Sequence, residues 1–147
     1  MGARITSKQL AELTGQAVAP ARRRNKHGVA EPDRRRWRGR LYDSRAEMLY
    51  AQQLELRLEA GELLEVVEQP RTWLGVPENR YAPDFLVIPA EGVPYYVDVK
   101  GQETPKFKRD KKLWAAYGRL ELRIVMRQGG RFAVVERIPG GGGHRGD

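Results

Sequence analysis

The chain contains no cysteine and only two histidines, His27 and His144, which lie in polar or glycine-rich stretches. The absence of cysteine excludes a disulfide framework and a thiolate metal site. Two isolated histidines also argue against a histidine-ligated zinc site and against a Ser-His-Asp triad. Other chemistry must therefore account for any activity of this chain.

The sequence also lacks a long apolar run. No stretch approaches the length of a membrane span, and the N-terminus has no signal-peptide core. We therefore expect a soluble, cytoplasmic protein with no membrane partner. Its 147 residues are enough for one domain with a real core and a tail or two.

Charge is distributed unevenly along the chain. Residues 1–45 carry a net charge of +8, residues 46–101 of −6 and residues 102–147 of +6. An acidic middle between two basic segments suits a metal-binding cluster that faces a polyanion. Short basic runs are often only solvated, but this division makes nucleic acid the favoured partner.

Two short motifs carry most of the chemical information, Pro83-Asp84 and Asp98-Val99-Lys100. They lie in the predicted strands 81–88 and 95–100, which flank a turn-forming stretch. A hairpin of this kind places Asp84 beside Asp98, and strand alternation puts Lys100 on the same face as Asp98. Two carboxylates and an ammonium group in one small volume are typical of a metal-dependent phosphodiester-cleaving site.

Each motif is weak by itself, because the chain contains a second acid-x-Lys at Asp110 and a second Pro-Asp at Pro32-Asp33. Asp110 falls in a predicted helix, where residues i and i+2 do not share a face, and Pro32-Asp33 has no strand pattern. A solvated surface hairpin is the alternative interpretation of the set at 84, 98 and 100.

The N-terminal 40 residues are predicted to form a flexible basic arm with a short helix over residues 5–14. A second helix is expected between an N-cap at Ser44 and a stop at Gly61. Glu47 has two possible roles there. It can complete a capping box with Ser44, or it can add a third carboxylate to the site from the head of the buried stripe.

The remaining pattern predicts strands at 63–69, 81–88 and 95–100, a helix that Thr104-Pro105 opens and Gly118 ends, and strands at 120–127 and 132–138. Residues 41–139 would thus form one domain, and the glycine-rich segment 140–147 a disordered tail. The order α-β-β-β-α-β-β indicates an α/β fold with a mixed central sheet.

This order, with an acid on the first core helix, Pro-Asp on the second strand and Asp-x-Lys on the third, resembles the PD-(D/E)xK nuclease superfamily. Within it, the chain is similar to phage-borne Holliday junction resolvases of the archaeal type. The resemblance covers about residues 41–127 and rests on the following segments: Tyr42-Asp43-Ser44-Arg45-Ala46-Glu47, Glu68-Gln69-Pro70, Tyr81-Ala82-Pro83-Asp84-Phe85 and Val97-Asp98-Val99-Lys100-Gly101, then Thr104 and Phe107.

The resemblance implies a restriction-endonuclease-like core and a role for each matched residue. Asp84, Asp98 and the Val99 carbonyl would ligate Mg²⁺, for which Mn²⁺ would substitute, and Glu47 would complete the site or bridge to a second ion. Lys100 would orient or help to deprotonate the attacking water, and the products would carry a 5′-phosphate and a 3′-hydroxyl. Ser44 and Gln69 are possible supporting residues.

DNA contacts are expected from the basic arm and from the helix after Thr104. The residues concerned are Arg22, Arg23, Arg24, Arg34, Arg35, Arg36, Trp37, Arg38, Lys106, Lys108, Arg109 and Lys112. The arginines would contribute salt-dependent affinity, and Trp37 could stack on an exposed base.

Three hypotheses follow from the sequence. The leading one is a homodimeric resolvase that cuts four-way junctions by paired symmetric nicks, because paired cuts need two sites related by a two-fold axis. It would act in the cytoplasm of the host cell if a phage encodes it. The second is an endonuclease of the same chemistry that acts on flaps, nicks or duplex DNA. The third is a non-catalytic nucleic-acid-binding module on a nuclease fold.

Overall fold

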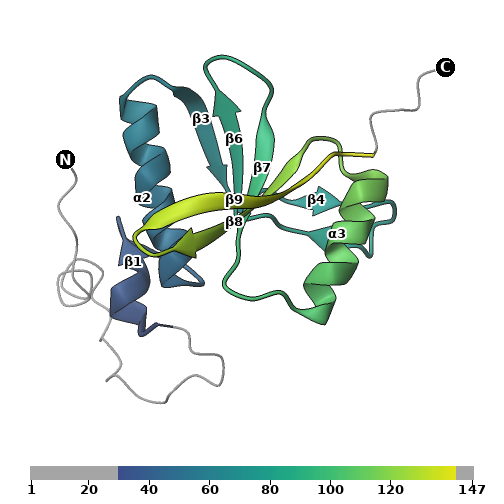
Figure 1. The fold of residues 1–147 in the computed structure, drawn as a ribbon, viewed down its shortest axis with the longest axis horizontal. Coiled ribbons are helices and arrows are strands. Elements are labelled where there is room, and N and C mark those ends of the chain that lie inside the picture. Colours follow the sequence, from purple (N-terminus) through teal and green to yellow (C-terminus); the bar gives the residue numbers. More distant parts are fainter. Residues whose placement is uncertain (1–29, 142–147) are drawn as a thin grey trace. The chain divides into compact units, whose positions relative to one another are not determined.

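A computed structural model describes residues 30–141 of the chain (Figure 1). The predicted helix over 5–14, the arginines at 22–24 and the tail from residue 142 lie outside the described residues. Contacts divide the chain into two units, residues 1–52 and 53–147, and the boundary falls inside helix α2 (Arg45–Glu59).

The first unit contains regular structure in the segment that was expected to be a flexible arm. A 3₁₀ helix, η1 (Pro32–Arg35), leads into a ribbon of β1 (Arg36–Trp37) and β2 (Arg40–Leu41). Both turn residues of the ribbon have positive φ, 52° at Arg38 and 75° at Gly39, as a two-residue hairpin turn requires. Residues 32–40, which the sequence assigned to a flexible basic arm, therefore contain short regular elements. Strands of two residues have no periodicity that a sequence pattern could show.

Helix α2 begins and ends where its capping residues predict. At its start, the Oγ of Ser44 accepts a hydrogen bond from the amide of Glu47 at 3.0 Å. At its end, Gly61 has a φ of 77°, and its amide donates to the Leu58 carbonyl. The amide of Glu62 donates to the Arg57 carbonyl. These two bonds form a Schellman motif, which satisfies carbonyls that would otherwise lack a partner.

The second unit is built on a five-stranded sheet with the order β3-β6-β7-β8-β9. The strands are β3 (Leu63–Glu68), β6 (Phe85–Pro89), β7 (Tyr95–Val99), β8 (Leu122–Gln128) and β9 (Arg131–Ile138). Strands β7 and β8 are parallel and are connected through helix α3 (Pro105–Tyr117), whereas the other neighbours are antiparallel. In Figure 1, β8 and β9 cross β3 and β6 at a steep angle, as the twist of a sheet produces. The predicted α/β fold with a mixed central sheet is confirmed.

A second ribbon interrupts the strand that was predicted over residues 81–88. Strand β4 (Thr72–Trp73) pairs with β5 (Arg80–Tyr81), and β6 begins only at Phe85. Pro83 lies in the interruption and has no amide hydrogen for a sheet. Asp84 lies directly before the first residue of β6.

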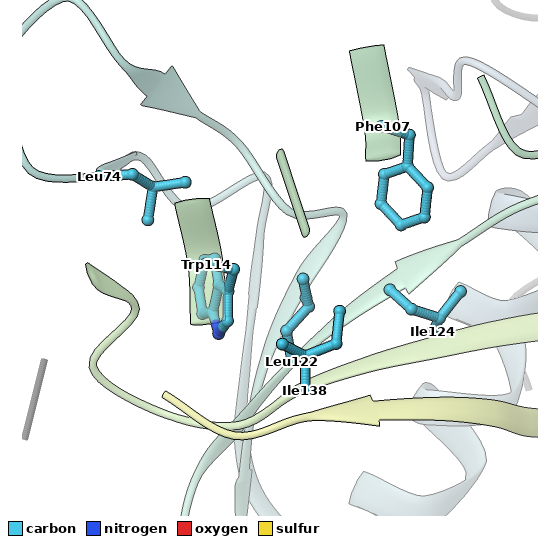
Figure 2. Packing of buried hydrophobic residues seen from close by; sticks show 6 residues of the cluster. All are labelled: Leu74, Phe107, Trp114, Leu122, Ile124 and Ile138. Atoms are coloured by element: carbon cyan, nitrogen blue, oxygen red, sulfur yellow. The ribbon is translucent and has the colours of Figure 1, made fainter. Parts of the chain in front are cut away.

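Helix α3 packs on the sheet through an apolar cluster. Figure 2 shows Phe107 and Trp114, both from α3, together with residues of β8 and β9. Thr104 caps the helix by accepting from the amide of Phe107 at 3.1 Å, as predicted. The indole Nε1 of Trp114 donates to the Leu120 carbonyl at 2.8 Å, which satisfies its one polar atom. The members of the cluster are Leu74, Phe107, Trp114, Leu122, Ile124 and Ile138.

Within residues 30–141, neither α2 nor α3 is long and apolar enough to cross a membrane.

Candidate active site

Asp84 and Asp98 lie beside each other at one end of the β6–β7 pair. The register pairs Phe85 with Val97, so the next position along aligns Asp84 with Asp98. The amide of Asp84 donates to Oδ1 of Asp98 at 3.1 Å, and the amide of Val99 donates to Oδ2 of Asp84 at 2.7 Å. The predicted juxtaposition of the two carboxylates is confirmed, and each is held by the backbone of the other strand.

The residue that follows β3 also holds Asp84 in place. The amide of Gln69, directly after β3, donates to the Asp84 carbonyl at 2.8 Å. Gln69 adopts a φ of 49°, which is uncommon for a residue other than glycine. Its backbone therefore supports the site at this position, while the residue itself is exposed.

Asp98 is a buried carboxylate with an incompletely satisfied oxygen. The residue is 2% exposed, and its Oδ2 has no hydrogen-bond partner within residues 30–141. This oxygen forms an ion pair with Nζ of Lys100 at 3.6 Å, which is longer than a hydrogen bond. Burial raises the pKa of Asp98 to about 6, although Lys100 and the Asp84 amide both lower it. The ionised form is therefore poorly stabilised by the protein alone.

Lys100 lies on the same face as Asp98, as strand alternation predicts. Its amide donates to the Val125 carbonyl at 2.9 Å, which extends the parallel pairing of β7 with β8 by one residue. Its Nζ is 4.4 Å from the centroid of the Phe107 ring, a cation–π distance. With 31% of its side chain exposed, the ammonium group remains accessible to a ligand.

Phe107 had no predicted role at the site beyond the resemblance, although its ring contacts this lysine. No linear spacing indicates that contact, because the docking of α3 on the sheet produces it.

Glu47 lies in the first turn of α2, within the other unit. Its side chain is buried, with 3% of the residue exposed, as expected for a member of the inward stripe. Ser44 acts as the helix cap, which confirms the structural role that the sequence proposed for it.

Oxygen donors suited to Mg²⁺ are present at the pair Asp84 and Asp98. No group of three or more His, Cys, Asp or Glu side chains that could hold a metal occurs among residues 30–141. Mg²⁺, however, keeps several waters and is commonly bound through only one or two carboxylates and the phosphates of a substrate. The buried Oδ2 of Asp98 lacks a donor, and a cation would satisfy it. The two carboxylates therefore fit a hydrated divalent cation.

The basic residues proposed to bind DNA have different surroundings. Lys106, Lys108 and Lys112 are exposed on α3, and a nitrogen of Arg109 donates to Oδ1 of Asn79 at 3.2 Å. Lys111 is paired with Glu103 and Glu136, and these contacts raise its pKa.

In the first unit, Arg35 donates to the carbonyls of Ala30 and Tyr42 at 3.1 and 2.6 Å, which indicates a structural role. The guanidinium of Arg38 lies over the Trp37 ring at 4.6 Å. Arg34 is exposed and Arg36 is half-buried. Arg22, Arg23 and Arg24 lie outside the described residues.

No curated protein and no solved structure matches this chain. A family model matches residues 33–129. The matched range includes Glu47, Asp84, Asp98 and Lys100. It begins inside the segment that the sequence assigned to the arm. The match covers more than half of the sequence, so the chain belongs to the family described as Protein of unknown function (DUF1064).

Proposed function

We propose that this protein is a Mg²⁺-dependent endodeoxyribonuclease. One observation carries the proposal: Asp84 and Asp98 are locked together by reciprocal hydrogen bonds, and Lys100 lies 3.6 Å from the unsatisfied oxygen of Asp98. A surface hairpin with solvated acids would not bury Asp98. Two carboxylates and an ammonium group that share one small volume suit the hydrolysis of a phosphodiester.

Each residue has a defined part in this proposal. Asp84 and Asp98, with the Val99 carbonyl, would hold Mg²⁺ or Mn²⁺. When bound, the metal would lower the pKa of a water molecule and offset the charge of the scissile phosphate. Lys100 would orient the attacking water and stabilise negative charge as it develops on the phosphate oxygens. The expected products carry a 5′-phosphate and a 3′-hydroxyl.

The distribution of charge supports a polyanionic substrate. The acidic middle of the chain, with a net charge of −6 over residues 46–101, lies in sequence between segments of +8 and +6. Basic segments bind phosphates by releasing counterions, and the affinity they provide falls as salt is raised. Exposed Lys106, Lys108 and Lys112 of α3 are available for such contacts.

The resemblance to phage-borne resolvases favours four-way DNA junctions as the substrate, cut by a homodimer in the cytoplasm. An endonuclease that acts on flaps, nicks or duplex DNA would use the same residues. Only the choice of substrate separates these two enzymes.

The test is cleavage of a labelled four-way junction and of a matched linear duplex by the full chain, with Mg²⁺ and with EDTA. Asp98→Asn is the inactive variant. Asp33→Asn is the matched control, because Asp33 follows a proline, as Asp84 does, but lies on the exposed surface of η1.

Symmetric nicks on the junction alone, lost in Asp98→Asn and kept in Asp33→Asn, would support the resolvase. Equal cutting of both substrates would support a nuclease without selectivity for junctions. If the wild type binds DNA but cuts neither substrate with Mg²⁺ or Mn²⁺, the proposal is wrong and the chain is a binding module.

A further inference from the structure

A pocket lies beside the β4–β5 ribbon, at the C-terminal end of α3. Its volume is about 310 Å³, in the range of small-molecule sites. Trp73 and Tyr117, with Arg119, also line a shallower hollow of about 700 Å³, so the two spaces adjoin. We call the first space the Trp73 pocket. It is lined mainly by Arg71, Trp73, Tyr96, Trp114, Tyr117 and Arg119.

The aromatic residues of the Trp73 pocket form a buried floor and an exposed rim. Trp114 is fully buried, and the ring of Tyr96 packs edge-on against it with centroids 5.0 Å apart. Trp73 and Tyr117, by contrast, are 53% and 46% exposed. Large aromatic side chains at the surface beside a pocket commonly contact a ligand.

Two contacts hold the rim in place. Gly75 has a φ of +87°, and a Cβ added there would lie 2.9 Å from the Tyr117 ring, so the backbone packs directly on this ring. The ribbon that carries Trp73 is fastened by a hydrogen bond of 2.6 Å from Oγ1 of Thr72 to the Tyr81 carbonyl. A preformed site loses less conformational entropy when a ligand binds.

The charge of the pocket selects the class of ligand. Arg71 and Arg119 are exposed, and neither pairs with a carboxylate within residues 30–141. No acidic residue lines the Trp73 pocket or the adjoining hollow. An aromatic cage for a cation would need the opposite charge, so a flat, uncharged ring that carries an anionic group fits best.

We infer that the Trp73 pocket binds an unpaired nucleotide of a DNA strand. The base would stack on the exposed rings of Trp73 and Tyr117, and Arg71 and Arg119 would hold the adjacent phosphates. Stacking on aromatic side chains combined with basic groups is the general mode of binding to single strands.

The position of the pocket connects it to the acid pair. Tyr96 precedes Asp98 by two residues in β7, so both side chains lie on the same face, about 7 Å apart along the strand. An unpaired nucleotide in the pocket would then lie close to the phosphate to be cut. This last step rests on the proposed function and specifies DNA with unpaired bases at a branch or an end as the substrate.

The experiment measures binding without cleavage. The affinity of the full chain for a fluorescent single-stranded oligothymidylate is determined in EDTA by anisotropy, with a matched duplex and free thymidine monophosphate as competitors. Variants are Trp73→Ala, Trp73→Phe and Arg119→Ala. Leu64→Ala and Arg131→Ala serve as matched controls, because both residues are exposed and lie outside the pocket, on β3 and β9.

Trp73→Ala is expected to weaken binding roughly 5- to 150-fold, the range found when a stacking residue is truncated. Trp73→Phe should restore most of the affinity, and Arg119→Ala should reduce the salt slope by about 0.7. The two control variants should bind as the wild type does. Because Trp73 and Arg119 are exposed, neither variant depends on repacking of the core.

The inference is overturned if Trp73→Ala and Arg119→Ala bind the oligonucleotide as Leu64→Ala does. It is also overturned if thymidine monophosphate competes as well as the oligonucleotide, which would indicate a site for free nucleotides, or if duplex DNA competes as well. Nuclease activity with unchanged binding by Trp73→Ala would leave the proposed function intact. Weaker binding by Trp73→Ala, with no nuclease activity in the wild type, would support the pocket and contradict the proposed nuclease.

Discussion

Asp84 and Asp98 each stabilise the position of the other. The Asp84 amide donates to the Asp98 carboxylate, and the amide that follows Asp98 donates back to the Asp84 carboxylate. An asparagine oxygen can accept these bonds as well, so Asn variants at either position remove the charge and keep the local geometry. Such variants therefore report on the charge at this site.

The stability of the protein without metal should fall as pH rises through the range in which Asp98 ionises. Burial raises the pKa of Asp98 from 3.8 to about 6, so the folded state binds more protons than the unfolded state between these values. The contribution of Asp98 is therefore most favourable below about pH 4 and is lost as pH rises to about 6. The total loss is about 3 kcal/mol.

Denaturant unfolding of the wild type and of Asp98→Asn, followed from about pH 4 to pH 8 in EDTA, measures this effect. Asp98→Asn should gain stability over the wild type as pH rises. Parallel pH profiles for the two proteins would show that the carboxylate is well stabilised when charged.

Mg²⁺ should stabilise the folded protein through the same carboxylates. A ligand that binds only the folded state raises stability by about 2.7 kcal/mol at a concentration of 100 times its Kd. We expect the melting temperature of the wild type and of Asp33→Asn to rise with Mg²⁺ and to return with EDTA. Asp84→Asn and Asp98→Asn should show little or no shift. An equal shift in all four proteins would place the cation elsewhere.

Tyr81→Phe should leave the protein equally stable or make it more stable. The Tyr81 hydroxyl is buried and has no hydrogen-bond partner within residues 30–141, while its ring packs edge-on to Trp114 at 5.8 Å. Phenylalanine keeps the ring and removes the unsatisfied hydroxyl, a change of about 1 kcal/mol in favour of folding. Thr72→Val is the contrasting variant, because it removes the 2.6 Å bond to the Tyr81 carbonyl. A loss of stability in Tyr81→Phe would reveal a partner for the hydroxyl.

Gly75→Ala should destabilise the protein more than Gly61→Ala does. Both glycines have positive φ, 87° and 77°, so alanine costs about 1 kcal/mol of backbone strain at each. At Gly61 nothing lies within 4 Å of the added Cβ, whereas at Gly75 the Cβ would contact the Tyr117 ring at 2.9 Å. Thermal unfolding measures the stability of both variants, and the difference between them is the cost of the contact with the Tyr117 ring.

Tyr117→Ala in the Gly75→Ala background should recover the difference between the two glycine variants, because it removes the obstructing ring. If Gly75→Ala costs no more than Gly61→Ala, the ring moves freely and the rim of the Trp73 pocket is not rigid.

Local rules predicted much of this fold. Ser44, Thr104 and Gly61 act at the helix ends through hydrogen bonds and backbone angles that involve only nearby residues. Asp84 and Asp98 could be paired from sequence, because one hairpin connects them and side chains alternate along its strands. The ribbons β1–β2 and β4–β5 were missed, since strands of two residues show no alternation.

By itself, then, the sequence determined the main helices and strands, the juxtaposition of Asp84 with Asp98, and the face that Lys100 shares with Asp98. All of these depend on short-range geometry. Tertiary packing alone decided the order of the strands in the sheet, the burial of Asp98 and the assembly of the Trp73 pocket. Each depends on elements far apart in the chain, whose contacts are selected by the burial of shared apolar surface and leave no periodic signal in the residues that form them.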